Sequence, residues 1–64
     1  MGGDPFRAFA ARPHSPDDLA RLTDEEEEIL LGRRRKTPQE MAIKMHISVE
    51  SVHRRQRSIL AKLG

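Results

Sequence analysis

The fold of this chain is decided by residues 37–64, which read TPQEMAIKMHISVESVHRRQRSILAKLG. Thr37 and Glu40 form a capping box, in which the hydroxyl and the carboxylate each accept a backbone N–H at the start of a helix. Pro38 takes the first helical position, where its missing N–H costs nothing. Apolar side chains follow at helical spacing: Met41, Ala42 and Met45. The pattern predicts a short helix that begins at Pro38.

A second helix follows after a short turn. Ser48 is a good helix cap, and the residues after it carry an apolar stripe of Val52, Ile59 and Leu63. His46 holds the turn position, where φ is often positive and where His is enriched among residues other than glycine. Ala42 is small enough to let two helices cross closely. We therefore predict a helix-turn-helix whose second helix covers about residues 49–63.

The residues before this unit predict one more helix. Thr23 and Glu26 form another capping box. The acidic run of residues 24–28 stands where the helix dipole favours negative charge, and Ile29 and Leu30 supply an apolar face. We expect this helix to run from residue 24 to residue 33 or 34.

Residues 1–21 differ from the rest of the chain because glycine and proline interrupt them repeatedly. We expect an N-terminal extension or linker outside the core, either flexible or partly helical, with a short helix capped by Asp4 and ending near Arg12. Residues 22–64 then form the folded domain. The predicted fold class is all-α, a helix-turn-helix bundle of three to four helices.

Charge is divided unevenly along the chain. Residues 1–28 carry three arginines against eight acidic residues, a net charge of −5. Residues 29–64 carry nine lysines and arginines against two glutamates, a net charge of +7. Such asymmetry indicates an anionic partner for the second half, and nucleic acid is the commonest one.

Several classes of function lack the residues that they need. The chain has no cysteine, tyrosine or tryptophan, no glycine-rich phosphate loop and no buried pair of carboxylates, so we expect no enzyme, no catalytic residue and no cofactor. His46 and His53 lack a third ligand nearby, which argues against a metal site. No apolar run approaches the length of a membrane span. We expect a location in the cytoplasm, associated with the nucleoid, and no membrane partner.

Spaced residues across positions 22–64 match the pattern of one family. The matching residues are Leu22, Thr23, Glu26, Glu28, Ile29 and Leu30 in the first predicted helix, Thr37 to Ala42 in the second, and Ile47, Ser48, Ser51, Val52, Ile59, Lys62, Leu63 and Gly64 at the end. With these residues the chain resembles the LuxR/GerE-type helix-turn-helix, the output domain of many bacterial response regulators and quorum sensors. It departs from the pattern at Arg55, where the family has His, and at Arg33–Lys36, in a loop one residue shorter.

The resemblance implies sequence-specific binding of duplex DNA by a transcription regulator, with the last helix in the major groove. The family's base-reading positions fall on His53, Arg54 and Arg57. Hydroxyl, amide and amine groups on the two helices are candidate phosphate contacts: Thr37, Gln39, Lys44 and Ser51. The resemblance also implies a homodimer on DNA through the last helix, at Ile59, Leu60 and Leu63. The basic loop of residues 33–36 would either touch a flanking phosphate or keep the loop soluble.

A different class of function remains open beside this one. The same fold could serve as a protein-binding module that pairs with a full-length regulator or docks on RNA polymerase, in the manner of an antagonist or of sigma-factor region 4. The acidic first half favours this alternative, because it would repel DNA if it lay near the contact face.

Overall fold

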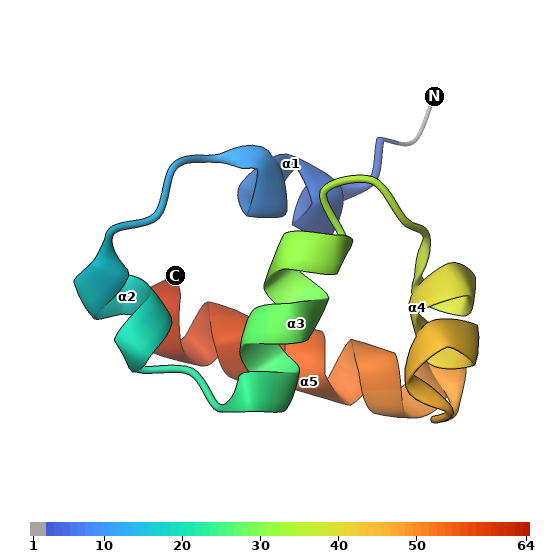
Figure 1. The fold of residues 1–64 in the computed structure, drawn as a ribbon. Coiled ribbons are helices and arrows are strands. Elements are labelled where there is room, and N and C mark those ends of the chain that lie inside the picture. The colour runs from blue at the N-terminus through green and yellow to red at the C-terminus, as the bar shows by residue number, and fades with distance from the viewer. Residues whose placement is uncertain (1–2) are drawn as a thin grey trace.

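The computed structural model describes residues 3–64, and all of its regular structure is helical (Figure 1). Met1 and Gly2, the start of the predicted extension, lie outside the described residues. The helices are α1 (Pro5–Ala11), α2 (Pro16–Ala20), α3 (Asp24–Gly32), α4 (Pro38–Met45) and α5 (Val49–Leu63). The all-α fold class is confirmed, although the described part of the chain holds five helices rather than three or four, because the N-terminal extension forms two. None of these helices is long and apolar enough to cross a membrane.

The helix ends lie where the capping residues predicted them. Both capping boxes are present: Thr23 with Glu26 at the start of α3, and Thr37 with Glu40 at the start of α4. The hydroxyl of Ser48 accepts the backbone N–H of Ser51 at 3.1 Å and so caps α5. Each accepted bond satisfies a backbone donor that the first helical turn leaves without a partner.

The long helix α5 makes the main helix–helix contacts of the fold. Helices α3 and α4 both lie against it, and α1 lies against α3 (Figure 1). The core between them is apolar and comes from every helix but α2, with Leu22 from the segment before α3: Phe6, Ala10, Leu22, Ile29, Leu30, Met41, Ala42, Val52 and Ile59. Leu63 is only partly buried against this core.

The N-terminal extension contributes to this core. Phe6 and Ala10 on α1 are buried, and α1 is capped by Asp4 as predicted. The expectation that residues 1–21 lie outside the core is therefore wrong for these two residues. Phe6 and Ala10 are four positions apart and therefore lie on the same side of α1. Burial of this side adds apolar surface to the core of a chain that is too short to bury much elsewhere.

The turn between α4 and α5 sets the direction of α5. His46 has φ 57° and ψ 43°, the left-handed conformation predicted for it. The backbone N–H of Ile47 donates to the carbonyl oxygen of Ala42 at 3.0 Å and closes the end of α4. The chain then enters α5 at Ser48, so the turn itself is short and fixed by a hydrogen bond.

Candidate nucleic-acid interface

Helix α5 has two sides of different character. Its inner side is buried against α3 and α4 through Val52, Gln56 and Ile59. Its outer side leaves the three predicted base-reading residues exposed: His53, Arg54 and Arg57. A 15-residue helix with an exposed basic side has the dimensions that a major groove admits.

The three residues of the outer side differ in what surrounds them. The side chain of Arg54 is 74% exposed, and its ion pair is with Glu50, one helical turn earlier, at 3.9 Å. His53 and Arg57 line a groove of about 340 Å³ beside Pro5 and Phe6 of α1. The helix therefore presents one guanidinium, that of Arg54, in a weak and exposed ion pair, and another, that of Arg57, at the edge of a groove.

The four candidate phosphate contacts lie in three places: the beginning of α4, its last turn and the first turn of α5. Thr37 and Gln39 are exposed at the beginning of α4, whereas Lys44 is exposed in its last turn. Ser51 is half-buried, and its hydroxyl accepts a hydrogen bond from the hydroxyl of Ser48 at 3.0 Å.

The beginning of α4 lies close to the outer side of α5. Pro38 and His53 line one groove of about 470 Å³, together with residues of the N-terminal segment. The backbone N–H of Thr37 donates to the carboxylate of Glu40 and lowers the pKa of that carboxyl. The structure thus places the beginning of α4, where Thr37 and Gln39 lie, on the side of His53 and leaves Lys44 at the other end of α4.

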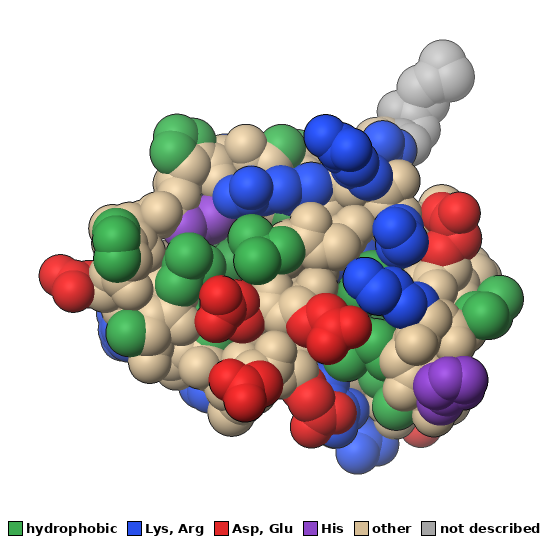
Figure 2. All heavy atoms as spheres, in the orientation of Figure 1, with side chains coloured by type: hydrophobic (Ala, Val, Ile, Leu, Met, Phe, Trp, Pro, Cys, Tyr) green, Lys and Arg blue, Asp and Glu red, His purple; other side chains and the backbone are tan. Residues whose placement is uncertain are grey.

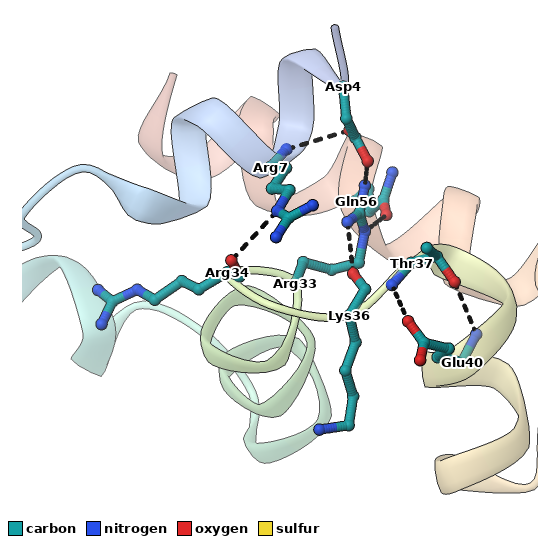
Figure 3. Close-up of polar contacts among 8 residues, drawn as sticks. All are labelled: Asp4, Arg7, Arg33, Arg34, Lys36, Thr37, Glu40 and Gln56. Carbon is teal, nitrogen blue, oxygen red and sulfur yellow. Dashed lines mark hydrogen bonds and ion pairs between the residues drawn. The ribbon is translucent and has the colours of Figure 1, made fainter.

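Arg33 is the first residue of the basic loop, and its side chain is buried in the interior (Figure 3). It is 1% exposed, and its guanidinium makes three hydrogen bonds. Nε donates to Oε1 of Gln56 at 2.8 Å, Nη1 donates to the carbonyl oxygen of Lys36 at 2.7 Å, and Nη2 donates to the carboxylate of Asp4. The guanidinium also lies over the ring of Phe6, 5.6 Å from its centroid.

Two residues of the basic loop, Arg33 and Arg34, are bonded to other parts of the folded chain. The hydrogen bond from Arg33 lowers the pKa of Asp4, so the negative charge of this carboxylate is paired with a buried cation. Arg34 donates through Nε to the carbonyl oxygen of Ala10 at 2.7 Å, and its own carbonyl oxygen accepts from Nε of Arg7 at 3.3 Å. Arg33 and Arg34 thus hold α1 in place.

A second polar cluster ties the other end of α5 to α3. One carboxylate oxygen of the buried Glu26 accepts from Nζ of Lys62 at 2.6 Å, and the other accepts from the hydroxyl of Ser58 at 2.5 Å. The backbone N–H of Thr23 adds a third bond at 2.9 Å. The hydrogen bond from Lys62, followed by those from Ser58 and Thr23, lowers the pKa of Glu26 to about 2. On the flank, Arg55 pairs with Glu25 at 3.2 Å.

The acidic residues of α3 that have no such partner lie away from the outer side of α5. Helix α3 contacts α5 with the side that carries Glu26, Ile29 and Leu30, so Asp24 and Glu28 lie on its opposite side. Figure 2 shows this opposite side, with acidic side chains over α3 and basic side chains over α1 and the turn that follows α3. The repulsion between the acidic half and DNA, which favoured the protein-binding alternative, is therefore weakened by geometry and by pairing.

The residues predicted for a dimer through the last helix are not equally available. Leu60 is 40% exposed and Leu63 is half-buried, whereas Ile59 is completely buried. Ile59 fills the core beneath α3, so the prediction that it contacts a partner is wrong in this fold.

Sequence reasoning missed Arg33, Gln56 and Asp4 as one cluster. A run of basic residues does not say which member is buried, but helical spacing from the apolar face could have shown it. Arg33 lies four residues after Ile29 and three after Leu30, on the buried side of α3. Gln56 lies four residues after Val52, which is equally a core position.

No group of three His, Asp or Glu side chains suited to a metal ion occurs within residues 3–64. A comparison of the chain with models of known protein families, with curated proteins and with solved structures finds no match. The resemblance to LuxR/GerE-type domains stays a prediction from the sequence motif.

Proposed function

We propose that this chain is a duplex DNA-binding domain of a bacterial transcription regulator of the LuxR/GerE type, and that it acts with the nucleoid in the cytoplasm. The observation that carries the proposal is the exposed outer side of α5, with His53, Arg54 and Arg57 on a helix that begins at a capped turn. The geometry supports it because α4 and α5 are joined by a short turn held at His46. The planar guanidinium of an arginine can donate to O6 and N7 of guanine at once through two N–H groups held in a fixed geometry.

The contacts divide into two groups under this proposal. Arg54 and Arg57 would read base edges, and His53 would lie next to a base or a phosphate. Thr37, Gln39 and Ser51 would position the domain on phosphates, as hydroxyls, amides and helix beginnings do. Lys44 would reach a phosphate only if the duplex extended along α4 to its last turn.

A single domain of this size would bind nonspecific DNA weakly and with a strong dependence on salt. Each phosphate neutralised by an arginine or lysine contributes about 0.9 to the slope of log K against log salt. Two to four such contacts would give a slope of roughly −2 to −4. A homodimer on DNA through Leu60 and Leu63 would raise the affinity by adding a second half-site.

The experiment is a fluorescence-anisotropy titration of a random-sequence duplex at two salt concentrations. It compares the wild type with Arg54→Ala/Arg57→Ala, and with Arg12→Ala/Arg21→Ala as a control that removes two exposed arginines elsewhere. We expect the wild type and the control to bind alike, with affinity that falls as salt rises, and the first double variant to lose binding. Wild-type protein that is folded by circular dichroism and does not bind would favour the protein-binding alternative. Equal losses in both double variants would show that net charge, rather than α5, carries the binding.

A further inference from the structure

The outward side of α3 carries a charge pattern that is symmetric about one exposed apolar residue. Leu31 is 41% exposed. Glu27 and Glu28 lie four and three residues before it, and Arg34 and Arg35 lie three and four residues after it. Residues three and four apart on a helix are surface neighbours, so Glu27, Glu28 and Leu31 share one side of α3, and Arg35 follows in the turn directly after it.

The backbone keeps this stripe continuous beyond the end of α3. The backbone N–H of Arg33 donates to the carbonyl oxygen of Ile29 at 2.8 Å, and that of Lys36 donates to Gly32 at 3.0 Å. Helix α3 itself ends at Gly32, and the backbone N–H of Arg35 donates to the carbonyl oxygen of Gly32 at 3.1 Å, so the chain makes one further turn that holds Arg35 next to the end of α3. The stripe therefore runs from acidic, through apolar, to basic.

The charged ends of the stripe are accessible. Glu28 and Arg35 are exposed and Glu27 is half-buried, whereas the guanidinium of Arg34 is already bonded to the carbonyl oxygen of Ala10. The four ion pairs formed within residues 3–64 do not use Glu27, Glu28 or Arg35. Figure 2 shows this face with its acidic side chains over α3 and its basic side chains beyond the upper end of the helix.

We propose that this stripe is a self-association surface, on which two copies of the chain pair antiparallel about a two-fold axis at Leu31. A two-fold axis there places Leu31 against its own copy. It also places the acidic end of each copy, with Glu27 and Glu28, against Arg35 of the other, because Glu27 and Arg35 each lie four residues from Leu31. Antiparallel α3 helices also align their dipoles favourably.

A second copy fits this surface better than other partners do. DNA would be repelled by the acidic half, and a basic protein surface would be repelled by the arginines. A two-fold partner satisfies both halves at once, and each favourable contact then occurs twice. The helix is only nine residues long, so the interface is small and the dimer is weak.

The inference does not depend on DNA binding, and its test uses no DNA. Sedimentation equilibrium of the full chain at low salt, from about 10 µM to 1 mM, measures the association constant. Arg35→Glu and Glu28→Arg are the test variants, because each places like charges against each other in the symmetric pair. Arg54→Glu is the matched control, with the same charge change as Arg35→Glu on the opposite side of the molecule. Far-UV circular dichroism confirms that each variant is folded.

The expected result is a weak wild-type dimer that dissociates as salt is raised. Each test variant alone should associate roughly tenfold less, since every altered pair occurs twice. An equimolar mixture of Arg35→Glu and Glu28→Arg should recover association as a heterodimer, whereas Arg54→Glu should behave as the wild type. A wild-type chain that is monomeric at 1 mM would overturn the proposal. So would a dimer that resists both test variants and dissociates with Leu60→Asp, because the last helix would then be the interface.

Discussion

The inner and outer sides of α5 carry similar polar residues in very different environments. On the inner side, Gln56 accepts a bond from the buried Arg33, and Ser58 and Lys62 donate to the buried Glu26. On the outer side, Arg54 has a single ion pair at 3.9 Å and is 74% exposed. The inner residues attach α5 to α3 and to the residue that caps it, whereas the outer residues have no comparable structural partner.

The difference shows why a count of basic residues overstates a binding surface. Nine lysines and arginines stand in residues 29–64, but Arg33, Arg34, Arg55 and Lys62 already hold other parts of the chain. A cation that is paired in the folded protein must break that pair before it can bind a phosphate. The comparison therefore predicts that inner substitutions lower stability and that outer substitutions lower binding alone.

The largest expected effect is that of Arg33→Met. Methionine retains the apolar stem but leaves the Gln56 amide oxygen, the Lys36 carbonyl oxygen and the Asp4 carboxylate without their donor. Loss of one partner in a buried charged cluster costs about 3 kcal/mol or more. A domain of this size has only a few kcal/mol of stability, so the variant should be largely unfolded.

Urea denaturation followed by circular dichroism measures this loss. Arg35→Met is the control, because Arg35 is exposed and makes none of these bonds. If Arg33→Met lost less than about 1 kcal/mol, the inner side would not differ from the outer side in the way that the contacts indicate.

The second effect concerns Glu26 and pH. Its pKa of about 2 in the folded protein lies below its ordinary value of 4.5, so its contribution to stability is complete above pH 4.5. The contribution is lost as pH falls from about 4.5 to 2, because the unfolded chain then binds the proton first. We expect Glu26→Gln to lower stability at pH 7 on the order of 2 kcal/mol, and the difference from the wild type to vanish near pH 2.

Thermal denaturation across pH 2 to 7 measures that difference directly. Glu28→Gln serves as the control, since Glu28 is exposed and belongs to none of the ion pairs among the described residues. A gap between wild type and Glu26→Gln that stays constant with pH would mean that the carboxylate charge is not what attaches α3 to α5.

The helix limits of this chain could be predicted from local sequence, whereas its polar interior could not. Thr23, Thr37 and Ser48 fix helix ends by bonds to residues three positions away, which the sequence displays directly. The bond between Arg33 and Asp4 joins residues 29 positions apart, and nothing local specifies it. For the same reason α1 was expected outside the core, although Phe6 packs beneath Arg33. The outer residues of α5 were predictable because an amphipathic helix leaves one side exposed.

A smaller change in stability should follow from His46→Gly. This substitution tests the turn between α4 and α5, which sets the direction of α5. His46 is exposed and has φ 57°. This left-handed conformation is unfavourable for a residue that carries a Cβ atom, whereas glycine adopts it without that steric penalty. We expect the variant to gain about 0.5–1 kcal/mol in urea denaturation, and His46→Val to lose stability. A loss in both variants would show that the imidazole, rather than the backbone conformation, stabilises the turn.

The smallest effect on stability is expected for Arg54→Ala/Arg57→Ala, and it is the one that isolates the outer side. Within the described residues, neither guanidinium makes a hydrogen bond or ion pair beyond the weak pair of Arg54 with Glu50. Alanine also favours helix slightly more than arginine does, so the free energy of unfolding should change by less than about 0.5 kcal/mol. Denaturation curves of the variant and the wild type should therefore coincide within error. Because the fold is then intact, any loss of DNA affinity in the same variant must come from the two missing guanidinium groups. A clear loss of stability would instead show that the outer side also supports the fold, and the division of α5 into a structural side and a binding side would fail.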